Sequence, residues 1–71
     1  MKTLDGTERR VLLRKYMDSG LNFYEARDKL NEFHDYLRNL RDKLRSAGKS
    51  EEDIDTKFKK EFEQMCQKLE R

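Results

Sequence analysis

The sequence predicts an all-α protein of three helices, and three observations support this. The 71 residues include no proline and only three glycines, so little in the long charged stretches obliges a helix to break. Apolar residues recur three and four positions apart, as they do along one face of a helix. Each such stretch follows a residue that can cap a helix N-terminus. We expect helices at about residues 6–19, 23–47 and 51–69, within a single helical domain of residues 1–71.

The first predicted helix is short and amphipathic. Asp5 and Glu8 have the spacing of a capping box, in which each side chain accepts a hydrogen bond from the other residue's backbone N–H. Gly20 can adopt the left-handed conformation that closes a helix. Leu12 and Tyr16, four residues apart, lie on its apolar face.

The second predicted helix carries the strongest pattern in the chain. Asn22 and Glu25 form another potential capping box at its start. Apolar residues then alternate at spacings of three and four without a polar interruption, which is a complete heptad seam. The seam consists of Phe23, Ala26, Leu30, Phe33, Leu37, Leu40, Leu44 and Ala47. We therefore expect one continuous helix whose seam is covered by other helices.

A weak seven-residue repeat accompanies this seam. Asp28, Asp35 and Asp42 occupy the outermost heptad position, and mainly basic residues flank the apolar stripe. The flanking residues are Arg27, Lys29, His34, Arg41 and Lys43. A helix that pairs with this one is expected to carry acidic residues on its own flanks.

The third predicted helix folds back on the second. The connection Gly48–Lys49–Ser50 is short enough to make the two helices antiparallel, and Ser50 can cap the new helix. Its apolar stripe contains Ile54, Phe58, Phe62, Met65 and Leu69. The expected architecture is thus an antiparallel hairpin of a long central helix and a C-terminal helix, with the short N-terminal helix packed on it.

Composition suggests that one copy has a thin core. Apolar residues make up 34% of the chain and charged residues 45%, so a lone copy buries little apolar surface. The seam of the second helix also extends about one turn beyond the third. We expect a homodimer that completes a helical bundle, with the first helix packed in its own chain or exchanged between copies.

The residues favour neither an enzyme nor a cofactor site. Residues 46–50 resemble the end of a phosphate-binding loop, but Lys43 stands where that motif needs glycine, and a helix precedes it in place of a strand. His34 and Cys66 alone cannot supply the four ligands of a structural zinc site. The carboxylates lack an evident water-excluding pocket. We expect no catalysis, cofactor, metal or small-molecule substrate.

Two groups of residues are candidates for binding a partner. Arg9, Arg10, Arg14 and Lys15 on the first helix form either an anion-binding face or a solvated helix face. Tyr24 and Tyr36 lie beside the seam, where each is either a shoulder of the core or an exposed aromatic anchor. The first two helices also resemble a helix-turn-helix in outline, but bulky Tyr16 and the length of the second helix argue against that motif.

These observations lead to three hypotheses about function. The 17 basic and 15 acidic side chains nearly balance, and no apolar run resembles a signal peptide or membrane span, so a cytoplasmic protein is expected. The leading hypothesis is a small non-enzymatic regulatory or adaptor protein that binds a larger protein through a helical face. The alternative is a dimeric nucleic-acid-binding regulator that uses the basic face of the first helix. A structural component of a larger assembly is the third.

Overall fold

The computed structural model describes residues 4–70, and within this range it contains three α-helices and no strand. The helices are α1 (Gly6–Asp18), α2 (Phe23–Ser46) and α3 (Glu51–Leu69). The all-α class and the three helices predicted from sequence are confirmed. The helices α1 and α2 each end one residue before the expected position, because Ser19 and Ala47 are their C-caps.

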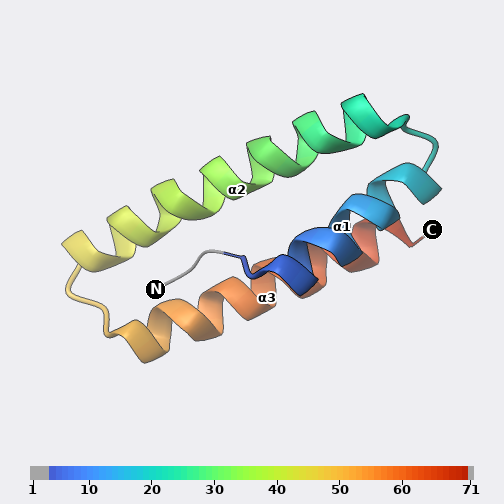
Figure 1. Ribbon diagram of the computed structural model, residues 1–71. Helices are drawn as coiled ribbons and strands as arrows, with labels where there is room; N and C mark the ends of the chain where they lie inside the picture. The colour runs from blue at the N-terminus through green and yellow to red at the C-terminus, as the bar shows by residue number, and fades with distance from the viewer. Residues whose placement is uncertain (1–3, 71) are drawn as a thin grey trace.

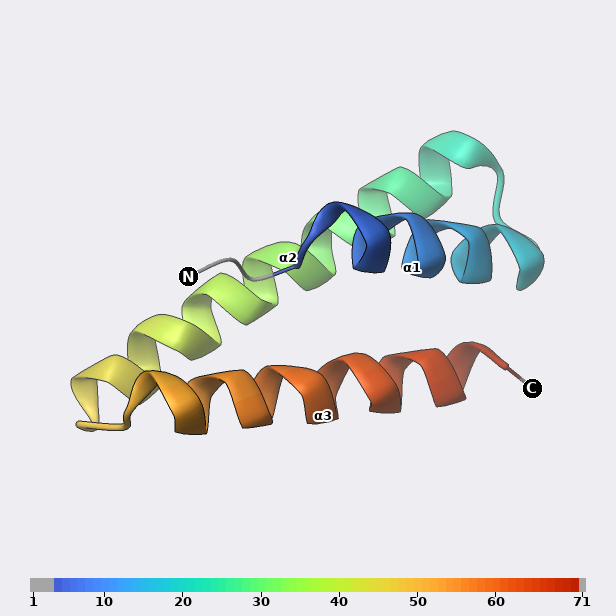
Figure 2. The same cartoon turned by 60° about the horizontal axis from the view of Figure 1, so that its bottom comes forward.

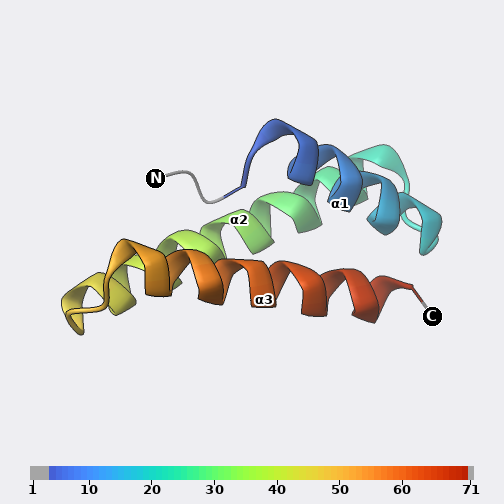
Figure 3. The ribbon, with the colours of Figure 1, turned by 90° about the horizontal axis from the view of Figure 1, so that it is seen from below.

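The three helices form an elongated bundle with extents of 39 × 20 × 17 Å. The helices α2 and α3 run antiparallel, and α1 runs antiparallel to α2 (Figure 1). Figure 2 shows that α2 and α3 lie close together at their connecting turn and diverge away from it, with α1 between them at the open end. The view from below shows the same closeness of α2 and α3 at their turn, and in it α1 lies beside α2 on the side away from α3 (Figure 3). The helix α1 therefore packs within its own chain, mainly against α2.

The core is thin and receives residues from all three helices. Leu12 of α1, Leu37 of α2 and Ile54 of α3 are completely buried. The other buried apolar residues are Leu4, Tyr16, Ala26, Leu30, Phe33 and Phe58. Burial of an aliphatic side chain stabilises a fold by ~1.5–3 kcal/mol, so this small set carries most of the packing energy.

The predicted seam of α2 is buried only in part by the helices of one chain. Its central residues, from Ala26 to Leu37, belong to the core, whereas Leu40 and Leu44 are half-buried. Phe23 is 47% exposed, and Ala47 is exposed as well. The expectation that other helices cover the whole seam does not hold at Phe23 within one chain, since α2 begins where it lies farthest from α3 (Figure 2).

The helix starts are capped as the sequence predicts. Asp5 Oδ1 accepts a hydrogen bond from the Glu8 N–H at 2.7 Å, and the Asp5 N–H donates to Glu8 Oε1 at 3.1 Å. Asn22 and Glu25 make the same reciprocal pair at the start of α2. Ser50 Oγ accepts from the Asp53 N–H at 3.2 Å at the start of α3. These bonds satisfy backbone donors that a helix leaves unpaired.

Glycine closes both α1 and α2. Gly20 and Gly48 have φ angles of 114° and 82°, in the region that side chains with a Cβ rarely adopt. The Leu21 N–H donates to the Tyr16 carbonyl at 3.4 Å, and the Lys49 N–H donates to the Leu44 carbonyl at 3.0 Å. These are Schellman closures, and they set the direction in which the chain leaves each helix.

A matched pair of glycine substitutions tests this role. Gly48→Ala should lower the free energy of unfolding by ~1–2 kcal/mol, because the left-handed conformation is costly for alanine. A Cβ at Gly48 would meet no atom within 4 Å, so the cost comes from the backbone alone. Gly6→Ala, in the first turn of α1 and equally free of contacts, should instead stabilise the protein by ~0.4–1 kcal/mol. Urea denaturation measures both, and equal effects would contradict the assigned role of Gly48.

Candidate functional site

The structure separates the four basic residues that the sequence placed on one face of α1. Arg9 is half-buried, and its positive charge acts on His34 of α2. Arg10 and Arg14 are exposed and line a shared surface hollow of about 390 Å³. Lys15 forms an ion pair with Glu70 at the far end of α3. Successive helix positions differ by ~100°, so these four positions do not share one surface.

The pair of Lys15 and Glu70 joins the ends of α1 and α3. The hydrogen bond from Lys15 Nζ to Glu70 Oε1 is the main reason that the pKa of Lys15 is raised above its ordinary value. The Glu70 side chain is largely exposed, so salt screens this pair. Lys15 is consequently engaged within the chain and is less available to an external anion than Arg10 or Arg14.

Arg9 belongs instead to a group of basic side chains at the junction of α1 and α2. We call Arg9, His34, Arg38 and Arg41 the α1–α2 basic cluster. Burial is the main cause that lowers the pKa of His34, and the positive charges of Arg9, Arg38 and Arg41 lower it further. Asp35 opposes this effect. The heptad pattern predicts that His34 lies beside the seam, but it does not indicate that the charges of three arginines act on it.

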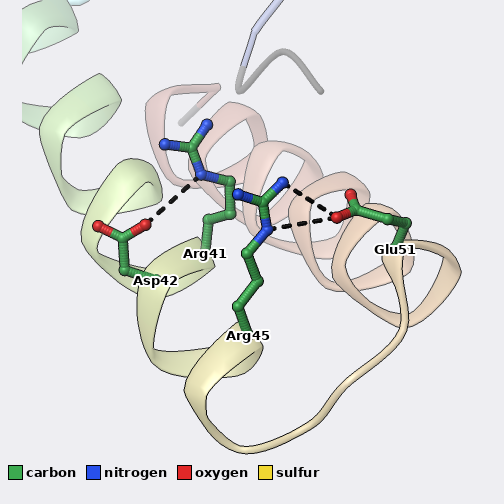
Figure 4. Close-up of polar contacts among 4 residues, drawn as sticks. All are labelled: Arg41, Asp42, Arg45 and Glu51. Atoms are coloured by element: carbon green, nitrogen blue, oxygen red, sulfur yellow. Dashed lines mark hydrogen bonds and ion pairs between the residues drawn. The ribbon is translucent and has the colours of Figure 1, made fainter.

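Arg41 has no strong acidic partner within this cluster. Its side chain is only 21% exposed, and its Nε atom is buried without a hydrogen-bond partner in the described part of the chain. The Oδ1 atom of Asp42 lies 3.7 Å from that nitrogen. Arg45, one turn farther along α2, instead donates to Glu51 Oε1 from Nε at 3.2 Å and from Nη2 at 3.0 Å (Figure 4). The two arginines therefore differ in how well their charge is neutralised.

A groove open to solvent lies on the other flank of the α2 seam. We call it the α2–α3 groove; it has a volume of about 380 Å³. Its apolar surface comes from one residue of α1, two of α2 and one of α3, and charged residues make up the remainder. The lining residues are Tyr16, Lys29, Glu32, Phe33, Tyr36, Glu61, Met65 and Lys68.

Tyr36 forms the edge of this groove and packs partly against the core. Its ring stacks on Phe33 with centroids 6.2 Å apart, and its hydroxyl donates to Glu61 Oε1 at 3.2 Å. Burial raises the pKa of Tyr36, and the negative charge of Glu61 adds to the shift. The side chain nevertheless remains 47% exposed. Tyr36 is thus a shoulder of the core whose outer edge is exposed to solvent.

Tyr24 lies in a second exposed aromatic site at the start of α2. It is 67% exposed, and its ring packs edge-to-face on Phe23 with centroids 5.6 Å apart. The guanidinium of Arg27 lies over the Tyr24 ring at 5.6 Å from its centroid. Sequence reasoning placed Phe23 in the seam and Arg27 on its flank, and so missed that the two contact Tyr24.

Other classes of site find no support in the described residues. Within residues 4–70, no three or more histidine, cysteine, aspartate or glutamate side chains gather as a metal site would require. No helix in this range is both long and apolar enough to cross a membrane. Burial raises the pKa of the Cys66 thiol, which disfavours the reactive thiolate. Comparisons with protein families, curated proteins and solved structures find no match to this chain.

The environment of His34 leads to a prediction about pH. Because its pKa is lowered in the folded chain, the unfolded chain takes up this proton at a higher pH. The contribution of neutral His34 to the free energy of unfolding is therefore fully present above its pKa in the unfolded chain, about 6.5. This contribution is lost as the pH falls from there through the lower pKa of His34 in the folded chain. Arg9→Gln should raise the His34 pKa, because it removes a nearby positive charge, whereas Arg10→Gln should leave it unchanged.

Proton NMR of the His34 ring across the pH range measures this effect directly. The chain has a single histidine, so its signals need no separation from others. An identical His34 pKa in the parent chain and in Arg9→Gln would contradict the position given to Arg9.

Proposed function

We propose that this chain is a small non-enzymatic adaptor or regulatory protein that docks on a larger protein through a helical face. The observation that carries the proposal is the α2–α3 groove with the half-exposed Tyr36 at its edge. The described residues offer this surface already formed, and no catalytic group needs to be invoked for it to bind a partner.

The groove has the chemistry that an amphipathic helix of a partner requires. Tyr16, Phe33 and Met65 supply apolar surface, and the charges around them are of both signs, as in Lys29 and Glu61. Diverging helices in a bundle leave room along their axes, and a further helix fills such a groove with its apolar face. We therefore propose a partner helix with one apolar stripe flanked by both acidic and basic residues.

Tyr36 is the side chain expected to contribute most to binding. Its stacking on Phe33 and its bond to Glu61 already restrict the ring, so little conformational entropy is lost when a partner covers it. Tyrosines with an apolar body and a polar tip are frequent energetic centres of protein interfaces. Tyr24, held against Phe23 and Arg27, is proposed as a second anchor.

We also retain the proposal that the chain forms a homodimer. One copy leaves Phe23 and Tyr24 exposed and leaves Leu40 and Leu44 only half-buried. These residues lie toward the two ends of the α2 seam, where a second α2 would extend the bundle. Leu37, by contrast, is completely buried inside one chain and so is not available to a second copy.

A photoreactive phenylalanine analogue in place of Tyr36 tests the docking surface. In native extract it should crosslink to a discrete larger protein, because the edge of the α2–α3 groove would lie inside the interface. The same analogue in place of Lys59, which is exposed on the opposite side of α3, is the matched control and should not. Tyr36→Ala should weaken binding of the captured protein by ~30-fold or more, as loss of an interface centre costs ~2 kcal/mol.

Two results would contradict docking in the groove. The same products from both positions would show that the crosslinks are non-specific. A product of twice the chain mass would identify a second copy of this chain in the groove in place of a larger protein.

A dimeric nucleic-acid-binding regulator is the second candidate. Arg10 and Arg14 are exposed, lie four residues apart on α1 and form no ion pair with any residue between 4 and 70. A dimer would bring two copies of this pair onto one assembly, where they could contact phosphates. Lys15 contributes less to this face because it pairs with Glu70.

A mobility-shift titration at two salt concentrations tests the second candidate. Binding should weaken steeply with salt, and Arg10→Gln with Arg14→Gln should reduce the slope of log affinity against log salt by about 2 per chain. Arg27→Gln, which changes an arginine near Tyr24, serves as the control and should leave the slope unchanged. Absence of any shift at low salt would rule out this candidate.

A further inference from the structure

We propose that the α1–α2 basic cluster of Arg9, His34, Arg38 and Arg41 is a binding site for a phosphate group in its doubly charged form. This site is separate from the α2–α3 groove and does not rest on the docking proposal. It also differs from the predicted basic face of α1, of which it includes only Arg9. Its ligand is defined by charge and oxygen geometry, either as free phosphate or as a phosphate monoester.

Helix geometry gathers the cluster on one flank of α2. His34, Arg38 and Arg41 are spaced by four and three residues, so they form one row along the helix. This row lies on the opposite flank of the seam from Tyr36, because residues 34 and 36 differ by ~200° around the axis. Arg9 reaches the row from α1, and its charge acts on His34 together with those of Arg38 and Arg41.

The cluster holds positive charge that the residues described by the structure neutralise only in part. Two basic residues elsewhere have acidic partners at shorter distances than the 3.7 Å between Arg41 and Asp42: Arg45 lies 3.0 Å from Glu51, and Lys57 lies 3.4 Å from Glu61. Arg9 and Arg38 form no ion pair with any residue that the structure describes. Converging like charges repel one another, and a bound anion would relieve that repulsion.

Acidic residues near the cluster offset its charge only in part. Asp35 acts on His34, and the nearest oxygen of Asp42 is 3.7 Å from Arg41 Nε. The buried Nε of Arg41 still has no hydrogen-bond acceptor. Both aspartates are exposed and belong to the outer row of α2, so solvent and salt screen their charges.

Phosphate suits this cluster better than a carboxylate does. A guanidinium presents parallel N–H groups that match a pair of phosphate oxygens, and clusters of arginines are a recurring means of recognising phosphate groups. A phosphate monoester carries nearly two negative charges and three terminal oxygens at neutral pH, enough to engage three arginines from two helices. A carboxylate offers one charge and two oxygens.

His34 provides a direct readout of occupancy. The charged groups that shift its pKa include Arg9 from α1 and Asp35, Arg38 and Arg41 from α2. A dianion bound among the arginines would favour protonated His34, so the site should bind a phosphate monoester more tightly as the pH falls from 7.5 to 6.5. Over this range a phosphate monoester still retains much of its second charge.

The test is an NMR titration of the full chain with sodium phosphate, at constant ionic strength maintained with sodium chloride. The His34 ring signals and the Nε–H signals of the three arginines should move together and saturate, with a dissociation constant of ~1 mM, or about 4 kcal/mol. The His34 pKa should rise in phosphate. A short phosphoserine peptide, compared with its unphosphorylated form, distinguishes the sources: tighter binding than inorganic phosphate identifies a monoester, and equal binding identifies the free anion.

Substitutions locate the site. Arg38→Gln alters an exposed side chain and should weaken phosphate binding about tenfold, as the loss of one charge-assisted hydrogen bond predicts. Arg9→Gln removes one positive charge of the cluster that belongs to α1, and it should weaken phosphate binding by a similar factor. Arg10→Gln, next to Arg9 in sequence but outside the cluster, should leave the affinity unchanged. Shifts that do not saturate, or equal losses in Arg10→Gln and Arg38→Gln, would overturn the proposal.

Discussion

The packing of α1 between the diverging ends of α2 and α3 is the constraint on which the rest of this structure depends. Leu12, Leu37 and Ile54 are completely buried, and each comes from a different helix. With 45% of the chain charged, few other residues are available to form a core. Without α1, the open end of the α2–α3 hairpin would expose its apolar residues to water. The two remaining helices would then lack most of the tertiary packing that stabilises them.

This packing gives the two flanks of the α2 seam different surroundings. The flank that meets α1 brings Arg9 to His34, Arg38 and Arg41, where charge of one sign accumulates. The flank that meets α3 places Tyr36 beside Glu61 and leaves the α2–α3 groove. One helix thus carries a basic surface and an aromatic groove on opposite flanks.

The helices and their ends were predictable from sequence because their signals are local. Capping pairs such as Asp5 with Glu8, and closing glycines such as Gly48, act within one helical turn. Tertiary neighbours were less predictable: periodicity shows that His34 flanks the seam, but it does not show which helix arrives there. Phe23 continues the heptad pattern, yet the divergence of α2 from α3 leaves it exposed.

Part of the site prediction could have been improved from the sequence alone. The angular separation of Arg9, Arg10, Arg14 and Lys15 around a helix already argues against one basic face. The spacing of His34, Arg38 and Arg41 equally marks one row, although the predicted flanking residues do not include Arg38. The pairing of Lys15 with Glu70 joins residues 55 positions apart, and no local pattern indicates a contact over that distance.

Amide hydrogen exchange of the full chain tests the central role of α1 most directly. If α1 shares one core with α2 and α3, the amides near Leu12 and Tyr16 should exchange as slowly as those between Leu30 and Leu37, since they would open only with the whole fold. If the α1 amides exchanged at the rate of an unprotected peptide while α2 and α3 stayed protected, the core and both flanks assigned to α2 would be contradicted.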